Sequence, residues 1–401
     1  MTKLNKALMA STAIAFATGL ALPASAQDPS AAPGVVASQK KVKLTLYGQV
    51  TRQFGFVGDG ESVTFKQGDN GNTGTRMGIV GAGKVNNDIS LKTIVEYSVS
   101  PGTSGGGTQF VNQGGSTGFS VRKLDVILSS KKFGSVWMGR GESVTDGTSE
   151  IDLGGMASAR LGGSSTYPVN RFVMMDKNSS LVPQAVRTVG TFFNSYDGAS
   201  RQNRIRYDTP TFFGFQAGVE TIDKHNVAAA VKYKGKIAGT ELAGGIGYCH
   251  TKGTSGSGDS ACFANSAASG TVDGIDQLNG SISFKLPFGL GAGFSGGTQW
   301  QNRTPAGAST NENPFNINPS IFYTTKLTEL GSTTIDYAFD YAENVTAKGD
   351  KGYAHQVDLL QRVDSIGGDY YVQFNYVTAE TATNDNIEPL WYIGGGFRQR
   401  F

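Results

Sequence analysis

The feature that most constrains this chain is a period-two alternation of side chains that recurs along most of its length. Two segments show it clearly, with one face carrying Tyr370, Val372, Phe374 and Tyr376 in the first and Ile335, Tyr337, Phe339 and Tyr341 in the second. The opposite faces carry Tyr371, Gln373 and Asn375, and Asp336, Ala338 and Asp340. This period predicts β-strands whose two faces meet different environments. A water-soluble sandwich also alternates, so the pattern alone leaves its solvent open.

The connections between the strands decide more, because short and long ones alternate. We place sixteen strands near 42–56, 74–85, 89–99, 121–130, 134–141, 202–209, 214–222, 226–234, 239–250, 274–286, 290–301, 315–327, 331–343, 354–364, 369–379 and 389–401. Tight turns such as 131–133 and 287–289 alternate with long loops rich in Gly, Ser and Thr, such as 57–73, 100–120 and 251–273. An even strand number with short turns on one rim predicts an all-β fold, a sixteen-stranded antiparallel transmembrane β-barrel.

One connection breaks this pattern. Residues 142–201, between the fifth and sixth strands, show no strong strand or helix pattern over roughly sixty residues. Folded inward, this segment would narrow the lumen; folded outward, it would form a surface loop or a partner site.

The N-terminus predicts export. Lys3 and Lys6 precede an apolar stretch, 7–22, that is followed by Ala24, Ser25 and Ala26. This is typical of a secretory signal, so we expect residues 1–26 to be cleaved, 27–40 to form a flexible lead-in and 41–401 to form the barrel. No later apolar run is long enough for a spanning helix, so a membrane location requires a closed barrel. A formal net charge of +3 is too balanced for a nucleic-acid binder.

Several segments resemble the general porins of the Gram-negative outer membrane. They are Leu46–Gln49, Thr75–Ile79, Phe133–Gly141 and the terminal Phe401, and the segment Thr145–Leu153 resembles the alphaproteobacterial subgroup. The resemblance implies a homotrimer in outer-membrane lipid and lipopolysaccharide, through which small hydrophilic solutes and ions diffuse. It also implies that Phe401 ends a signal read by the barrel assembly machinery.

The resemblance further implies that the third external loop, 142–201, folds into the lumen as a constriction whose carboxylates face a basic wall. Carried onto this chain, the acids are Glu142 at the entrance, Asp146, Glu150 and Asp152, and the bases are Arg76, Arg122 and Arg140. Gln49 stands where many relatives place a Lys, which weakens the positive side. The alternation of Leu124, Val126 and Leu128 leaves open whether Arg122 or Lys123 faces inward.

The two cysteines, Cys249 and Cys262, flank part of a long loop. In an exported protein an even count favours a disulfide, with two free thiols as the alternative. No further cysteine is available for a structural zinc site, so we expect no metal.

Catalytic motifs fail their structural context. Gly102–Gly106 fits GxSxG and Gly291–Gly296 fits GxGxxG, but no helix is expected after either. The three histidines lie far apart, so we expect no enzyme, no catalytic residue and no cofactor. The alternatives to a diffusion pore are a substrate-selective channel and a surface adhesin or structural barrel that acts through its external loops.

Overall fold

The computed structural model describes residues 34–39, 42–70, 72–100, 118–156, 169–170, 172–176, 188–193, 196–222, 226–251, 274–301, 313–344, 348–381 and 386–401. The predicted signal, 1–26, lies outside the described residues. The helices within them are α2 (Val189–Phe192) and the 3₁₀ turn η5 (Asp364–Ile366). Neither of these helices is long and apolar enough to cross a membrane.

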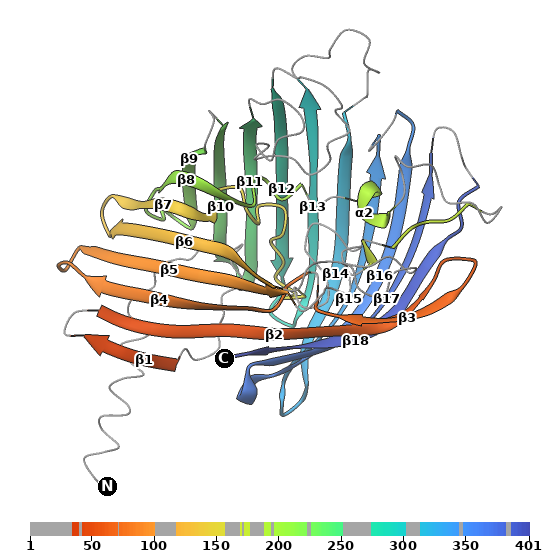
Figure 1. The fold of residues 1–401 in the computed structure, drawn as a ribbon, viewed down its shortest axis with the longest axis horizontal. Helices are drawn as coiled ribbons and strands as arrows, with labels where there is room; N and C mark the ends of the chain where they lie inside the picture. Colours follow the sequence, from red (N-terminus) through yellow and green to blue (C-terminus); the bar gives the residue numbers. More distant parts are fainter. Residues whose placement is uncertain are drawn as a thin grey trace.

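Strands make up most of the described chain (Figure 1). They are β1 (Gly34–Gln39), β2 (Val42–Gly58), β3 (Val63–Gly68), β4 (Arg76–Lys84), β5 (Ile89–Ser100), β6 (Gly118–Ser130), β7 (Gly134–Glu142), β8 (Arg201–Asp208), β9 (Phe215–Ile222), β10 (Asn226–Ile237), β11 (Thr240–Thr251), β12 (Ile275–Lys285), β13 (Leu290–Gln301), β14 (Phe315–Thr328), β15 (Gly331–Glu343), β16 (Lys351–Val363), β17 (Gly368–Glu380) and β18 (Leu390–Arg400).

The barrel closes between its last and first long strands. β18 pairs antiparallel with β2 from Trp391 opposite Gly58 to Arg400 opposite Gln49. The sheet has 18 strands, and without β1 and β3 the remaining sixteen form the ring of antiparallel neighbours. The predicted sixteen-stranded β-barrel is therefore confirmed.

Each strand has one apolar and one polar face, as the alternation predicted. The apolar face carries exposed side chains such as Val50, Ile205, Ile282 and Phe374. The polar face carries buried ones such as Thr51, Arg204, Ser281 and Gln373. In a membrane-spanning barrel the apolar face contacts lipid and the polar face borders the interior.

Tight turns close one rim of the barrel. The turn before β13 ends at Gly289, whose φ of 100° suits glycine. A Cβ there would lie 2.0 Å from the carbonyl oxygen of Thr324, so a side chain would displace β14. These tight turns lie where the sequence predicted the short rim.

Strand β2 has partners that the sequence did not predict. Its first residues pair with β1, in the expected lead-in 27–40, and its last residues pair with β3, in the expected loop 57–73. The physical reason is length: β2 has 17 residues, whereas its barrel neighbours β18 and β4 have 11 and 9. β1 and β3 bond the backbone groups that those shorter strands leave along β2.

The largest buried apolar cluster joins the 142–201 segment to the last strands. From the segment it includes Phe172, Met174 and Phe192, and from the wall it includes Val377 of β17 and Tyr392 of β18. Both wall residues are buried, whereas their strand neighbours Tyr376 and Ile393 are exposed. The segment thus packs on the polar side of the wall.

Candidate functional site

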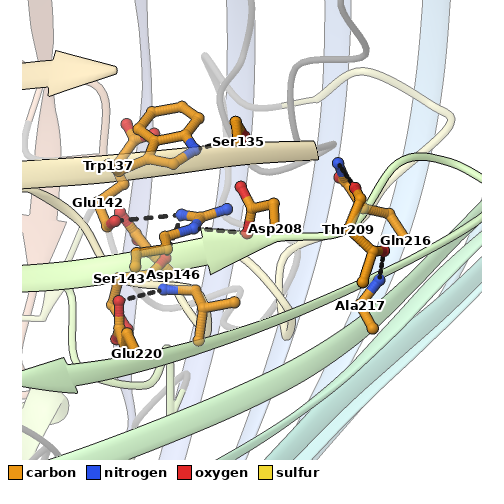
Figure 2. Close-up of polar contacts among 12 residues, drawn as sticks. Ser135, Trp137, Glu142, Ser143, Asp146, Asp208, Thr209, Gln216, Ala217 and Glu220 are labelled. Atoms are coloured by element: carbon orange, nitrogen blue, oxygen red, sulfur yellow. Dashed lines mark hydrogen bonds and ion pairs between the residues drawn. The ribbon is translucent and has the colours of Figure 1, made fainter. Parts of the chain in front are cut away.

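The 142–201 segment begins at the end of β7, where two buried arginines of β8 bind its backbone. Arg204 donates to the carbonyl of Glu142 over 3.0 Å, and Arg206 donates to the carbonyl of Ser143 over 3.1 Å. Arg204 also makes two 2.8 Å bonds to the carboxylate of Asp125. Arg206 pairs with Asp208 at 2.8 Å. Figure 2 shows Glu142, Ser143 and Asp208 gathered at this point.

A carboxylate of β9 holds the next residues. Glu220 accepts a 3.0 Å bond from the backbone N–H of Val144 and a bond from the hydroxyl of Ser143 (Figure 2). The guanidinium of Arg206 also lies over the ring of Trp137 of β7, 4.9 Å from its centroid. The start of the segment is therefore held by charged side chains that water barely reaches.

Residues 148–153 of the segment run along β12 and are bound to it by uncharged hydroxyl groups. The hydroxyl of Ser281 accepts from the N–H of Ile151 over 3.0 Å and donates to the carbonyl of Thr148 over 2.6 Å. Two residues further along β12, Ser283 accepts from the N–H of Leu153 over 3.1 Å. The spacing of the two serines matches two residues of the segment, because alternate side chains of a strand share one face.

The segment then reaches the polar face of β16 and β17. Arg362 donates to the carbonyl of Gly155 over 2.9 Å. Met156 is fully buried against Leu360 and Tyr371. Together with the apolar cluster that includes Tyr392, the described contacts of the segment thus extend from β7 to β18.

Three carboxyls from the two ends of the segment meet: the predicted Asp146 and Glu150 near its start, and Asp197 near its end, which the sequence analysis did not select. Burial and the nearby Asp146 raise the pKa of Glu150 to about 8. Burial, Glu150 and Asp146 together raise the pKa of Asp197 well above its ordinary value. Arg201 lies 3.8 Å from the carboxylate of Asp146, and Lys232 donates to the backbone carbonyl of Asp146 over 3.0 Å.

The other two predicted acids, Glu142 and Asp152, bind different kinds of partner. Glu142 pairs with Lys123 at 2.6 Å and lies 4.0 Å from Arg201. Asp152 instead turns to its own backbone, accepting from the N–H groups of Gly154 and Met156 over 2.7 and 3.0 Å. It stabilises a turn, and it forms no ion pair with any described residue.

A β-bulge settles the choice between Arg122 and Lys123. The register of β5 and β6 shifts between Glu96 and Tyr97, so Arg122 is the extra residue and Lys123 stands opposite Glu96. Both side chains therefore reach acids: Arg122 pairs with Glu96 at 2.7 Å, and Lys123 pairs with Glu142. The sequence left open which of Arg122 and Lys123 faces inward, and in the structure both side chains pair with acids of the polar face.

Arg76 lies on the same wall, opposite Gln49 and within electrostatic reach of Glu96 and Arg201. Among the described residues it has no ion-pair partner within 4 Å. Gln49 is buried and donates to Thr73 and Gly74, so it contributes no charge to the wall.

The assignment of Arg140 to the basic wall is corrected. Arg140 stands in register with Leu124 and Asn203, which are both exposed, and it follows Val136 and Met138 on the apolar face. A strand residue two positions from an exposed apolar neighbour shares its face. Arg140 therefore lies on the wrong side of the wall to line a pore.

Sequence reasoning left the most buried bases, Arg204 and Arg206, out of the site. Residues 203–208 alternate in the sequence, with Asn203, Ile205 and Tyr207 on one face and Arg204, Arg206 and Asp208 on the other, so the sequence does contain a signal for their orientation. That they bind the backbone of 142 and 143 is a tertiary contact with no local sequence signature.

Two further expectations concern single residues. Cys249 is disulfide-bonded, whereas Cys262 lies outside the described residues, so their pairing stays a prediction. Phe401 exchanges two backbone bonds with Gly48, 3.0 and 3.1 Å long, and so extends the closing strand pair. In the part of the chain that the structure describes, no group of three or more acidic, His or Cys side chains is arranged to hold a metal ion.

A closed antiparallel ring with an apolar outer face and a charged polar face defines a transmembrane β-barrel of the outer-membrane type. A family model described as Gram-negative porin matches residues 10–359. The chain belongs to the Gram-negative porin family, whose members lie in the outer membrane. A search of the curated proteins finds no match.

Solved structures of outer-membrane proteins share the fold. OmpT of Vibrio cholerae has 13% identity and a TM-score of 0.58, covering 92% of this chain and 99% of its own. The anion-selective porin from Comamonas acidovorans has 16% identity and a TM-score of 0.57, with 90% and 100% covered. OmpF of Salmonella typhi, in complex with daunomycin, has 14% identity and a TM-score of 0.54, with 90% and 98% covered.

Proposed function

We propose that this chain forms a water-filled channel for passive diffusion of small hydrophilic solutes and ions, with the 142–201 segment inside the lumen as its constriction. One observation carries the proposal: the segment bonds to polar-face residues from β8 to β16. A loop lying outside the ring has no access to those side chains. The segment therefore narrows the interior without needing a separate plug domain.

Opposed charges give this constriction its selectivity. The segment supplies Asp146 and, at its entrance, Glu142, while the wall supplies Arg76 and Arg122. Glu150 adds its negative charge only above neutral pH, because its pKa is raised to about 8. Charges of opposite sign across a narrow aqueous gap orient dipolar solutes and disfavour apolar ones, which must disrupt ordered water. Asp152 and Arg140 have no part in this arrangement, for the reasons given above.

The remaining features follow from the family. The proposal includes a homotrimer in outer-membrane lipid and lipopolysaccharide, insertion by the barrel assembly machinery with Phe401 in its signal, and cleavage after residue 26. It also includes a Cys249–Cys262 disulfide and passive transport without catalysis or cofactor.

Single-channel conductance in planar bilayers tests the constriction. Replacing 148–193 by a short Gly-Ser linker is expected to enlarge the conductance step, because the contacts to β12 and β16 are lost. The matched control shortens 302–312, which the sequence predicts to be an external loop, and is expected to leave the step unchanged. An unchanged step in the first variant would place the segment outside the conducting path and favour a substrate-selective or adhesive barrel.

A further inference from the structure

Three arginines surround one buried aspartate at the short-turn ends of β16, β17 and β18. Asp369 has no exposed surface. Arg398 donates to it through Nε over 2.9 Å, Arg400 lies 3.1 Å away and Arg362 lies 3.9 Å away. This group, here called the Asp369 cluster, is separate from the acids and bases of the proposed constriction.

The strand register builds the Asp369 cluster. Arg362, Asp369 and Arg398 stand directly opposite one another on three adjacent strands. Arg400 follows Arg398 by two residues, so it points to the same face. That face is the polar one, because Leu360 and Tyr371, which are buried against Met156, share it.

The charges of the Asp369 cluster do not balance. Three guanidinium groups face one carboxylate, which leaves two positive charges in excess. Among the described residues, Arg362 and Arg400 form ion pairs with Asp369 alone, and their side chains keep 32% and 14% of their surface exposed. Elsewhere on the polar face, by contrast, Arg206 and Arg122 each have a carboxylate within 2.8 Å.

We propose that the Asp369 cluster binds a small multivalent oxyanion of the phosphate class between Arg362 and Arg400. A guanidinium is planar and always charged, and it presents paired N–H donors that match the oxygens of such an anion. A dianion neutralises the two excess charges that remain when Asp369 draws the three arginines together. Chloride, with one charge and no oxygens, gains only screening.

The site also touches the constriction. Arg362 divides its donors between Asp369 and the carbonyl of Gly155. An anion on Arg362 therefore sits next to Gly155 of the 142–201 segment, at the short-turn side of the barrel. The inference rests on the proposed function in one respect, since solutes reach the Asp369 cluster through the lumen.

Equilibrium binding to the folded, detergent-solubilised protein tests the site without any conductance measurement. The probe is inorganic pyrophosphate, titrated calorimetrically at low salt, with chloride in place of pyrophosphate as the reference. The variant with both Arg362→Gln and Arg400→Gln is expected to weaken binding by about tenfold or more, because charge-assisted bonds are lost. Asp369→Asn is expected to tighten it, since it removes the competing carboxylate.

Arg140→Gln is the matched control, because it removes an arginine from the apolar face and is expected to leave the affinity unchanged. Arg400→Lys keeps the charge, so a folded protein with near-normal affinity is expected even if Arg400→Gln fails to fold. Pyrophosphate affinity that is equal in the wild type and in the double variant Arg362→Gln with Arg400→Gln, or absent from folded wild type, overturns the proposal. A channel that conducts but binds no pyrophosphate rejects this site alone, and binding without conductance rejects the proposed function alone.

Discussion

Two stretches of the 142–201 segment, its start at 142–144 and the later residues 148–153, are held in different ways. At its start, Arg204, Arg206 and Glu220 bind the backbone of 142–144 from positions that water barely reaches. Further along, the hydroxyls of Ser281 and Ser283 bind it through neutral bonds. A buried charge left without its partner is costly, whereas one neutral bond exchanges cheaply with water. The start of the segment thus acts as a fixed anchor, and the later part as a set of replaceable contacts.

The largest expected effect comes from breaking the anchor. Arg204→Met leaves the carboxylate of Asp125 buried without its two 2.8 Å bonds. We expect a loss of about 3–5 kcal/mol in the free energy of unfolding, as for other broken buried ion pairs. The midpoint of denaturant unfolding, followed by the heat-dependent gel migration of the barrel, measures it.

The double variant Arg204→Met with Asp125→Asn removes both charges and separates the two contributions. It is expected to recover part of the lost stability, because no uncompensated charge remains. If the single and double variants are equally unstable, the cost lies in packing and the anchor owes nothing to its charges.

The strands of this anchor could be predicted from the sequence, whereas its contacts could not. Period-two alternation placed β8 near 202–209 and set Arg204 opposite Ile205, because that signal is local. The bulge at Arg122 could not be predicted, since it arises from a register shift against Glu96 on a neighbouring strand. β1 likewise exists because β2 is longer than β18, which is a property of two distant strands.

The candidate site was predicted less completely than the fold. Family resemblance placed Arg140 in the basic wall, whereas the alternation of its own strand sets it on the same face as Val136 and Met138. The structure agrees with the alternation. Asp152 was selected as an acid, but its short side chain bonds the N–H groups of Gly154 and Met156 instead. Asp197 was missed because its proximity to Asp146 exists only after the segment folds back on itself.

A smaller effect is expected from Glu220, the anchor residue that binds Ser143 and Val144. Glu220→Gln keeps the size of the side chain but replaces charged by neutral bonds to Ser143 and Val144. We expect a loss of about 1.5–3 kcal/mol in the free energy of unfolding, typical of bonds to charged groups. Gln216→Glu, on the same strand but nearer the tight turn, is the control for charge alone. Equal stability of Glu220→Gln and wild type would contradict the anchor.

The later, neutral contacts should be weaker still. Ser281→Ala and Ser283→Ala each remove a hydroxyl that bonds the segment, and each is expected to cost about 0.5–1.5 kcal/mol. Current noise in single-channel traces should rise, because the segment then leaves β12 more often. Ser135→Ala, whose hydroxyl bonds Trp137 and not the segment, is the control. A loss of stability as large as that of Arg204→Met would show that 148–153 are held as firmly as 142–144, and would contradict the comparison.

The smallest expected effect concerns the carboxyl of Glu150, which lies near Asp146. Because burial and Asp146 raise the pKa of Glu150 to about 8, Glu150 is mostly protonated at pH 6 and mostly charged at pH 9.5. Raising the pH across this window adds negative charge to the proposed constriction, so the cation-to-anion permeability ratio should rise by about twofold. The reversal potential under a salt gradient measures this ratio.

The same shift has a consequence for stability with a definite sign. Since the folded pKa of Glu150 exceeds its ordinary value of 4.5, folding disfavours its charged form. The free energy of unfolding should therefore fall as the pH rises from about 4.5 to about 8. Glu150→Gln should remove both the permeability step and this slope, whereas Glu329→Gln, on an exposed tight turn, should remove neither. A permeability step that survives in Glu150→Gln would assign the titration to Asp197, whose pKa is also raised.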